Sequence, residues 1–429
     1  MAYFDYVVKY QIKAECSSPF RTGAADGDRE EILIDRYGNP FIQGTSIAGA
    51  LRSWIAENRS EQLAEELFGS EEVEGRLIIS DGNFDKDVQL NSRPRLQMDT
   101  RTGTAEEGKK FDVKYVSVGS VFTFLITCLG KREESDWSVT EEVLSALNAG
   151  QIRLGALKSS GFGKVSLSVK KQIFDLKKES DRNKWLKDQE QYEPVKLKPV
   201  KEKQKVTFLL SGEMKEVLVK DTVHKEKGRG DGKSASVTVN IKENSVPVIP
   251  GSSVRGVVRS RVESIAIQLG LDQKIIEDMF GCASEGRTGG RCGRVQFEDV
   301  QLKMIPGTTQ EHKASRIRIN KFTGGVIRKA LFIEESVSAS VQIRITMEEE
   351  PAECLLMMYA LRDLGIRLYG LGSGYAIGRG YIDAEELKVT LPDERMIKME
   401  FEEGYVTRVN EEGQMVLRAW NEQMGELGK

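Results

Sequence analysis

Residues 247–259 read PVIPGSSVRGVVR, and residues 40–52 read PFIQGTSIAGALR. Glycine, serine and arginine residues recur at the same spacing in both stretches. Glycine permits close backbone approach, serine or threonine can supply an N-cap oxygen, and apolar residues then follow at helical spacing. Each stretch therefore predicts a turn that leads into a helix. The free N–H groups and the positive dipole end at such a start suit a phosphate, although one copy alone is more simply an ordinary capped helix packed near a strand.

The repeat continues through further landmarks in the same order. The matching pairs are LFG at 67–69 and MFG at 279–281, the strands at 75–81 and 293–299, RLQMDTRTG at 95–103 and RIRINKFTG at 316–324, and the glycine-rich loops at 155–165 and 372–382. The period far exceeds that of a solenoid unit. The sequence therefore predicts a tandem duplication of a whole domain.

Composition agrees with two ordinary domains. The chain has 429 residues, 39% of them hydrophobic, and we expect no membrane-spanning segment and no signal peptide. Five scattered cysteines argue for a reducing cytoplasm without a disulfide framework. Cys282, Cys292 and His312 lack a paired-ligand spacing, so no zinc site is predicted. A net charge of -3 does not by itself predict a nucleic-acid partner, so the distribution of charge matters more.

The order of predicted elements is the same in the two halves. The predicted pairs are strands at 3–15 and 205–212, amphipathic helices at 53–67 and 260–279, strands at 113–128 and 334–347, and helices at 140–149 and 352–364. This order favours an α+β fold with two tandem ferredoxin-like cores and long loop insertions. The predicted organisation is a first module at 1–170, a charged linker at 171–204, a second module at 205–391 and an acidic amphipathic extension at 392–429. The extension either folds back on the core or docks on a partner.

The ordered set of motifs resembles the RAMP superfamily, in particular the guide-RNA-binding backbone subunits of type III CRISPR effector complexes. The motifs are IPGSSxxGxxR, the LFG turn, GRVxFxD, RIxIxxxTGG and the terminal glycine-rich loop. The second copy matches better, since the first departs at Gln43 and Thr104. Two modules in one chain are similar to the fused backbone subunits of type III-D complexes. The resemblance implies RRM-like modules, binding of CRISPR RNA (crRNA) and complementary target RNA, other effector subunits as partners, and a cytoplasmic location.

Such subunits hold the guide by its phosphates and shape, which requires basic and glycine-rich surfaces. The interval from 312 to 333 is basic and contains no acidic residue; its candidates are Lys313, Arg316, Arg318, Lys321, Arg328 and Lys329. The candidates at the helix starts are Ser46, Arg52, Ser253, Arg255 and Arg259, and those in the glycine-rich loops are Lys158, Lys164 and Arg379. Arg52 and Arg259 could equally pair with carboxylates of their own domain.

The resemblance also implies cleavage of bound target RNA by an aspartate in the first loop of each module. A carboxylate can hold Mg²⁺ or another divalent ion, which polarises a phosphate while the neighbouring 2′-hydroxyl attacks in line. Asp26 and Asp231 lie at matching places in ADG and GDG, as candidate catalytic residues and metal ligands. Asp28 is a rival to Asp26, and Asp221 and His224 are rivals to Asp231. Asp-Gly is also common turn chemistry.

Two alternatives differ from target cleavage. In the first, the chain is a non-catalytic scaffold that binds crRNA, and its loops only position the strand. In the second, it is an endoribonuclease that trims the guide precursor, a class that typically uses histidine; His224 is the only loop histidine.

Overall fold

A computed structural model describes most of the chain. The described residues are 4–23, 31–86, 88–98, 105–131, 136–200, 205–221, 224–227, 234–282, 290–305 and 311–427. They form two compact units. The first comprises residues 1–92, 112–158 and 162–202, and the second comprises residues 93–111, 159–161 and 203–429. Two short stretches of the first sequence repeat therefore belong to the second unit.

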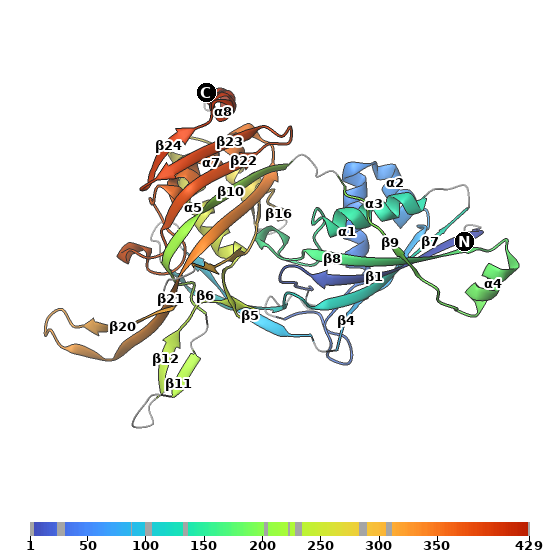
Figure 1. The fold of residues 1–429 in the computed structure, drawn as a ribbon, viewed down its shortest axis with the longest axis horizontal. Coiled ribbons are helices and arrows are strands. Elements are labelled where there is room, and N and C mark those ends of the chain that lie inside the picture. The colour runs from blue at the N-terminus through green and yellow to red at the C-terminus, as the bar shows by residue number, and fades with distance from the viewer. Residues whose placement is uncertain are drawn as a thin grey trace. The chain divides into compact units, whose positions relative to one another are not determined.

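The first unit is built around β1, which lies antiparallel between β7 and β8. In sheet order its strands are β2 (Phe41–Ile42), β4 (Gly82–Phe84), β7 (Val121–Gly130), β1 (Tyr6–Cys16), β8 (Val165–Asp175) and β9 (Glu193–Val195), and β3 (Leu77–Ile79) also pairs with β7. The helices α1 (Gly44–Asn58), α2 (Glu61–Phe68) and α3 (Asp136–Asn148) cover one face (Figure 1). Alternate β1 residues, from Val8 to Cys16, are buried in the core that these elements enclose.

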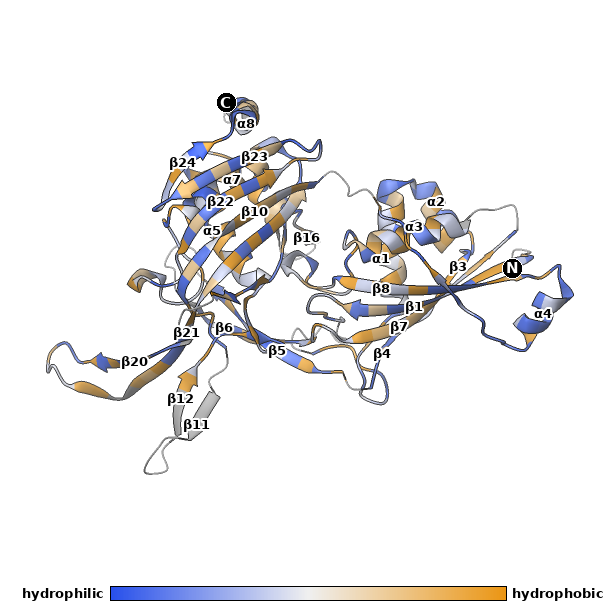
Figure 2. Cartoon of the chain, in the orientation of Figure 1, coloured by the Kyte–Doolittle hydropathy of each residue, from blue (hydrophilic) through white to orange (hydrophobic). Residues whose placement is uncertain are grey.

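The second unit repeats this arrangement around β10, which lies antiparallel between β21 and β22. In sheet order its strands are β11 (His224–Lys227), β12 (Ser234–Thr238), β21 (Val326–Glu348), β10 (Lys205–Val217), β22 (Ile382–Thr390), β23 (Met396–Glu402) and β24 (Tyr405–Val409), while β17 (Gln296–Phe297), β19 (Lys303–Met304) and β20 (Glu311–Ile319) also pair with β21. Its helices are α5 (Gly251–Gln268), α6 (Lys274–Phe280), α7 (Pro351–Gly365) and α8 (Glu411–Leu427). Hydrophobic and hydrophilic residues alternate along these strands (Figure 2).

In both units the first strand lies between the two strands that flank the second long helix. This is the strand order of a ferredoxin-like βαββαβ core. The predicted α+β class with two ferredoxin-like cores is therefore confirmed.

The remaining elements lie outside the two core sheets or at their margins. They are β5 (Leu90–Met98), β6 (Ala105–Val116), α4 (Glu179–Leu186), β13 (Lys242–Glu243), β14 (Val246–Ile249), β15 (Gly281–Cys282), β16 (Arg291–Cys292), β18 (Val300–Gln301) and the 3₁₀ turns η1 (Lys158–Ser160) and η2 (Tyr375–Ile377). β5 and β6 form a two-stranded hairpin. Among the described residues, no helix is long and apolar enough to cross a membrane.

The predicted helices differ from the observed ones in their bounds. The helices predicted at 53–67 and 260–279 are each observed as a pair of helices, α1 with α2 and α5 with α6. The pairs begin at the glycine turns, Gly44 and Gly251. α2 is separate because the Ser60 side chain accepts a hydrogen bond from the Leu63 N–H and caps a new helix. The single strand predicted at 113–128 was wrong, because a turn at residues 117–120 divides β6 from β7.

β21 is the longest strand and serves two structures. Its C-terminal half pairs with β10 in the core sheet, and its N-terminal half pairs with β20. The β20–β21 hairpin therefore extends beyond the core of the second unit (Figure 1). The hairpin contains most of the strip that the sequence predicted to be basic.

The segment predicted as a linker is partly ordered on the first unit. β8 continues to Asp175, beyond the predicted boundary at 170, and β9 pairs with it. The ring of Trp185 in α4 packs edge-on against Phe174, with their centroids 5.2 Å apart. Residues 171–202 therefore belong to the first unit. The charged composition of this segment did not reveal the apolar residues that anchor it.

The C-terminal extension folds back on the second core. β23 pairs with β22, and α8 packs against α7. Val416, Trp420 and Met424 lie one helical turn apart and are 2%, 4% and 8% exposed. The second unit therefore continues well beyond residue 391. Of the two alternatives that the sequence left open, the structure favours an extension that folds back on the core over one that docks on a partner.

Replacing Trp420 with alanine should destabilise the second unit by about 3–5 kcal/mol, because the change leaves a cavity beneath α8. Met415→Ala is the matched control, since Met415 on the same helix is 70% exposed and should change stability by less than about 0.5 kcal/mol. Urea unfolding, followed by far-ultraviolet circular dichroism, measures the stability of both variants. Equal stability of the two variants would show that α8 is not part of the core.

Candidate nucleic-acid interface

The two helix starts are occupied by carboxylates of the chain itself. The Gly44 N–H donates to Asp81 Oδ1 at 2.7 Å, and the Gly251 N–H donates to Asp299 Oδ1 at 2.8 Å. A Cβ atom on Gly44 would lie 2.5 Å from the Ile79 carbonyl oxygen, so only glycine fits there. The prediction that these starts present free N–H groups to a phosphate is therefore corrected at their first residue. Each is a capped helix that packs closely on a strand.

The arginines that follow these starts also have partners within their own units. Arg52 pairs with Glu61 at 3.4 Å, and Arg259 pairs with Glu263 at 2.7 Å. The Arg255 guanidinium donates to the Phe280 carbonyl, and burial, with Arg259 nearby, lowers its pKa. Pairing within the domain, the alternative that the sequence left open for Arg52 and Arg259, is the arrangement observed.

The remaining candidates at the helix starts and glycine-rich loops differ in exposure. Ser46 and Lys158 are exposed, whereas Ser253 and Lys164 are half-buried. Arg379 is buried and donates to Glu216 at 3.1 Å and to Glu334 at 2.8 Å. The phosphate contact of Arg379 stays a prediction, and in this structure its guanidinium is bound to two carboxylates.

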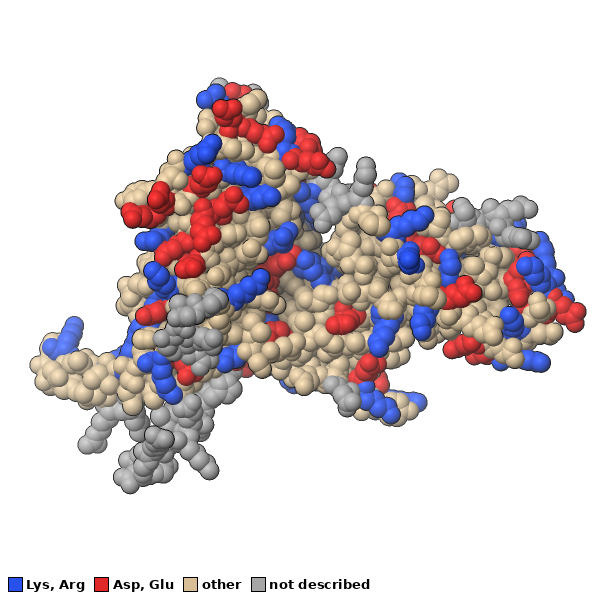
Figure 3. Space-filling view, in the orientation of Figure 1, with Lys and Arg blue, Asp and Glu red and all other residues tan. Residues whose placement is uncertain are grey.

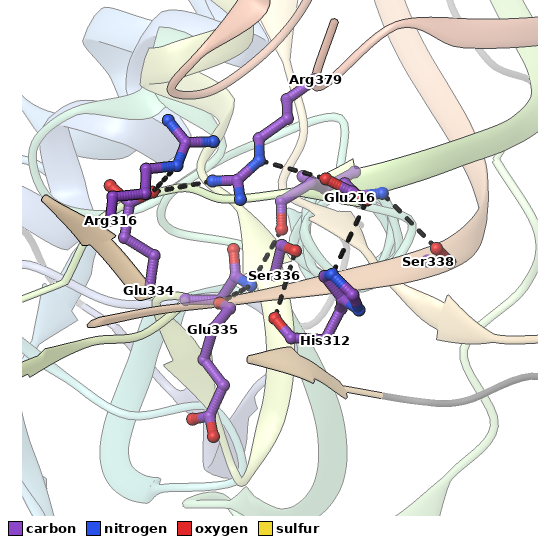
Figure 4. Close-up of polar contacts among 10 residues, drawn as sticks. Glu216, His312, Arg316, Glu334, Glu335, Ser336, Ser338 and Arg379 are labelled. Carbon is purple, nitrogen blue, oxygen red and sulfur yellow. Dashed lines mark hydrogen bonds and ion pairs between the residues drawn. The ribbon is translucent and has the colours of Figure 1, made fainter. Parts of the chain in front are cut away.

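Glu334 is the centre of a polar network at the root of the β20–β21 hairpin (Figure 4). Its carboxylate binds Lys220 at 3.2 Å, Arg316 at 3.5 Å and Arg379 at 2.8 Å. Burial alone would raise the pKa of Glu334, but the hydrogen bond and charge of Lys220, with those of the two arginines, hold it below the ordinary value. Glu334 thus joins the segment that leads into β11, the basic hairpin and the glycine-rich loop.

A buried amide ties the same three-strand junction together. The Asn240 side chain accepts from the Val219 N–H at 2.7 Å and donates to the Val217 carbonyl at 3.1 Å and the Glu335 carbonyl at 3.4 Å. Asn240 is 2% exposed. It therefore holds the end of β10, the exit from β12 and the root of β21 in one arrangement.

The hairpin that carries the predicted catalytic loop leaves from this junction. β12 pairs in parallel with β21 at Ile333 and Glu334, and β20 pairs with the same two residues from the other side. β11 and β12 flank residues 228–233, the segment that contains Asp231. The structure therefore brings the β11–β12 hairpin and the basic strip to opposite edges of one strand.

The individual catalytic candidates are only partly described. Asp26, Asp28 and Asp231 lie outside the described residues. His224 is the first residue of β11, but its side chain is not described. Asp221 is half-buried, and its N–H donates to the Val239 carbonyl at 3.0 Å. Among the described residues no cluster of three or more histidine, cysteine, aspartate or glutamate residues could hold a metal ion.

The basic hairpin has two different faces. The register pairs Arg316 with Phe332, so these side chains share one face with Glu334. Ile317 and Leu331 pair on the other face, and both are at least half exposed. Figure 3 shows basic side chains but no acidic ones on the outer part of this hairpin. The arrangement offers cations to a phosphate backbone and exposed apolar groups to bases or to protein.

The other basic candidates follow this hairpin to its end. Lys313 and Arg318 are exposed on β20. Lys321 lies over the ring of Phe322, 5.1 Å from its centroid, and Phe322 is 86% exposed. The side chains of the last two candidates are outside the described part of β21; they are Arg328 and Lys329.

Sequence reasoning missed the apolar component of this hairpin. The exposed residues are Ile317, Ile319, Phe322, Val326, Ile327, Leu331 and Phe332. The alternation of arginine and isoleucine in RIRI at 316–319 is the signal that could have revealed it, since alternate strand residues face opposite sides.

Comparison with known proteins establishes the family. The model of the RAMP superfamily matches residues 13–166 and 227–383, so the chain belongs to this superfamily. The chain is 29% identical over 112 residues to the "CRISPR system Cmr endoribonuclease Cmr4" of Pyrococcus furiosus, covering 25% of this chain and 38% of that protein. It is 45% identical over 51 residues to the "CRISPR system CMR subunit Cmr6" of Saccharolobus solfataricus, covering 12% of this chain and 18% of that protein.

These matches are partial, since the chain spans well under half the length of either curated relative. A solved structure of the type III-B Cmr-beta complex bound to cognate target RNA contains a similar chain, with 22% identity and a TM-score of 0.32. That match covers 40% of this chain and 62% of the other.

Replacing Glu334 with glutamine should destabilise the second unit by about 1–3 kcal/mol, because it removes the charge that three cationic groups share. The folded-state pKa of Glu334 is lowered, so its contribution is present above the unfolded value and is lost as the pH falls through the folded value. The variant should therefore differ from the parent near neutral pH and converge with it in acid. Glu335→Gln is the control, and denaturant unfolding at several pH values measures the difference. A constant difference down to pH 2 would contradict the assigned ion pairs.

Proposed function

We propose that the chain is a backbone subunit of a type III CRISPR effector complex, which binds crRNA along its RAMP modules and cleaves the complementary target RNA. Membership of the superfamily supports this proposal, as do the two partial matches to Cmr subunits. The structural observation that carries it is the junction on β21, where the basic β20–β21 hairpin and the β11–β12 hairpin flank the same two residues.

Binding in this proposal is electrostatic and independent of sequence. Arg318 and Lys321 on the hairpin would contact guide phosphates and leave base edges free to pair with the target. Glu334 would fix Arg316, because a guanidinium held by a carboxylate retains donors in a defined direction. Exposed Phe322 and Phe332 would contact bases by stacking, which tolerates any sequence.

Cleavage in this proposal uses the loop aspartates. Asp231, with Asp26 in the first module, would hold a divalent ion that, when bound, stabilises charge on the scissile phosphate. The 2′-hydroxyl of the preceding nucleotide would attack in line, so the chain's own contribution is to hold the strand in that geometry. The predicted products are a 2′,3′-cyclic phosphate and a 5′-hydroxyl end.

A non-catalytic scaffold is the second candidate. The two relatives differ in this respect, since one is named an endoribonuclease and the other a subunit. Intact binding of target RNA, without any metal-dependent product, would support the scaffold.

Replacing Arg318 and Lys321 together with alanine should weaken crRNA binding by about tenfold or more, because two phosphate contacts are lost. Each phosphate contact to a single strand also contributes about 0.7 to the salt slope. The slope of log K against log salt should therefore fall by about 1.4. Arg408→Ala with Arg418→Ala is the matched control, because both residues are exposed on β24 and α8. Filter binding across a salt series measures the change. An unchanged slope would remove the hairpin from the RNA interface.

Replacing Asp26 and Asp231 with alanine, singly and together, should remove target-cleavage products one at a time while target binding persists. Chelation by EDTA should remove all products in the parent. Denaturing electrophoresis of end-labelled target RNA in the reconstituted complex resolves the products. Asp221→Ala serves as the comparison, because Asp221 is the rival of Asp231 as the catalytic residue of the second module. A double variant that yields the parent's products would refute both aspartates.

A further inference from the structure

The sheet of the second unit carries charged rows on the face that points away from its core. α7 packs against β22 and α8 packs against β23. The side chains that these two strands bury beneath the helices alternate along each strand; they are Leu387, Val389, Ile397 and Met399. The residues between them therefore lie on the opposite face of the sheet.

The strand register sorts these outward residues by charge. Lys388 of β22 lies directly opposite Lys398 of β23. Two residues along the same strands, Glu386 lies directly opposite Glu400. Lys388, Lys398 and Glu386 are half-buried, and Glu400 is exposed. One row across the two strands is therefore basic, and the neighbouring row is acidic.

Within one sheet this arrangement is unfavourable, because like charges directly opposite on neighbouring strands repel. Opposite charges are only diagonal neighbours, such as Lys388 and Glu400. None of the four side chains forms an ion pair with another residue of the described part of the chain. Figure 3 shows basic and acidic side chains side by side over the sheet of the second unit. Both rows are thus open to charges of opposite sign from outside the unit.

The pattern of the two rows is complementary to itself. They lie about 7 Å apart, the length of two strand residues. A two-fold axis that runs between the rows, across the strands, would lay the basic row of one copy over the acidic row of another. Lys388 would then face Glu386 of the second copy, and Lys398 would face Glu400 of the second copy. Each of these contacts occurs twice in such an isologous interface.

We propose that this face of β22 and β23 is a self-association surface, on which a second copy of the chain binds with its two charged rows exchanged. The inference goes beyond the proposed function. It concerns a part of the second unit that lies mostly beyond residue 383, where the match to the superfamily model ends.

Charge favours a second copy over RNA at this surface. A phosphate backbone laid on the basic row would lie about 7 Å from the acidic row, which is within the Debye length of about 8 Å at physiological salt. The acidic row would therefore repel the strand. A second copy meets both rows with opposite charge and relieves the repulsion within each row.

The first measurement is the sedimentation velocity of the purified full-length chain. We expect a reversible dimer at about 0.1 M salt that dissociates at about 1 M, because the Debye length falls from about 10 Å to about 3 Å. A chain that is monomeric at the lower salt concentration over its whole soluble range would overturn the proposal.

Charge reversal identifies the surface. Lys388→Glu with Lys398→Glu makes both rows acidic, and Glu386→Lys with Glu400→Lys makes both rows basic. Each double variant should self-associate at least about tenfold more weakly than the parent, whereas an equimolar mixture of the two should form a heterodimer. Arg418→Glu with Glu422→Lys is the control, because both residues are exposed on α8, and it should dimerise like the parent.

Thermal unfolding establishes that each variant folds. If a reversal unfolds the chain, Lys388→Gln with Lys398→Gln removes the charges without reversing them and should also weaken the dimer. Unchanged dimers in both reversal variants, or a mixture that stays monomeric, would contradict the exchanged rows. A loss of crRNA affinity on reversal of the lysines, without a change in oligomeric state, would assign the face to RNA and overturn the proposal.

Discussion

The ion pairs of Glu334 determine how the candidate interface is held. This carboxylate lies where β21 leaves the core sheet and enters the hairpin, and it binds one cation from each of three segments. Without it, Arg379 would lose one of its carboxylate partners and keep Glu216, and the hairpin would lose its ion pair with Lys220 in the segment that leads into β11. A buried, shared charge is costly to leave unpaired, so the three segments are held together as one arrangement.

A second constraint acts twice, at the two helix starts. Glycine allows the helix to approach the strand, and the aspartate after that strand caps the first N–H. The same geometry has different surroundings in the two units, because Asp299 is covered and Asp81 is exposed. The local cap is therefore the same in the two copies, and its exposure to solvent differs.

Local patterns predicted the features that depend on neighbouring residues. The repeat, the glycine turns, the opening strands and the basic strip at 312–333 could all be predicted, since each follows from residue patterns along the chain. Burial of Arg379 could not, because its partners Glu216 and Glu334 are distant in sequence. The packing of Trp185 on Phe174 was also missed, because Trp185 lies in a charged segment that was predicted to be a linker.

In the proposed function, two fused RAMP modules hold one guide RNA. The most direct measurement is the length and end sequence of RNA that copurifies with the chain and its partner subunits. A guide-binding backbone should carry RNA of discrete length with a fixed, repeat-derived end. Protein free of RNA, or RNA of random length and sequence, would contradict the claim.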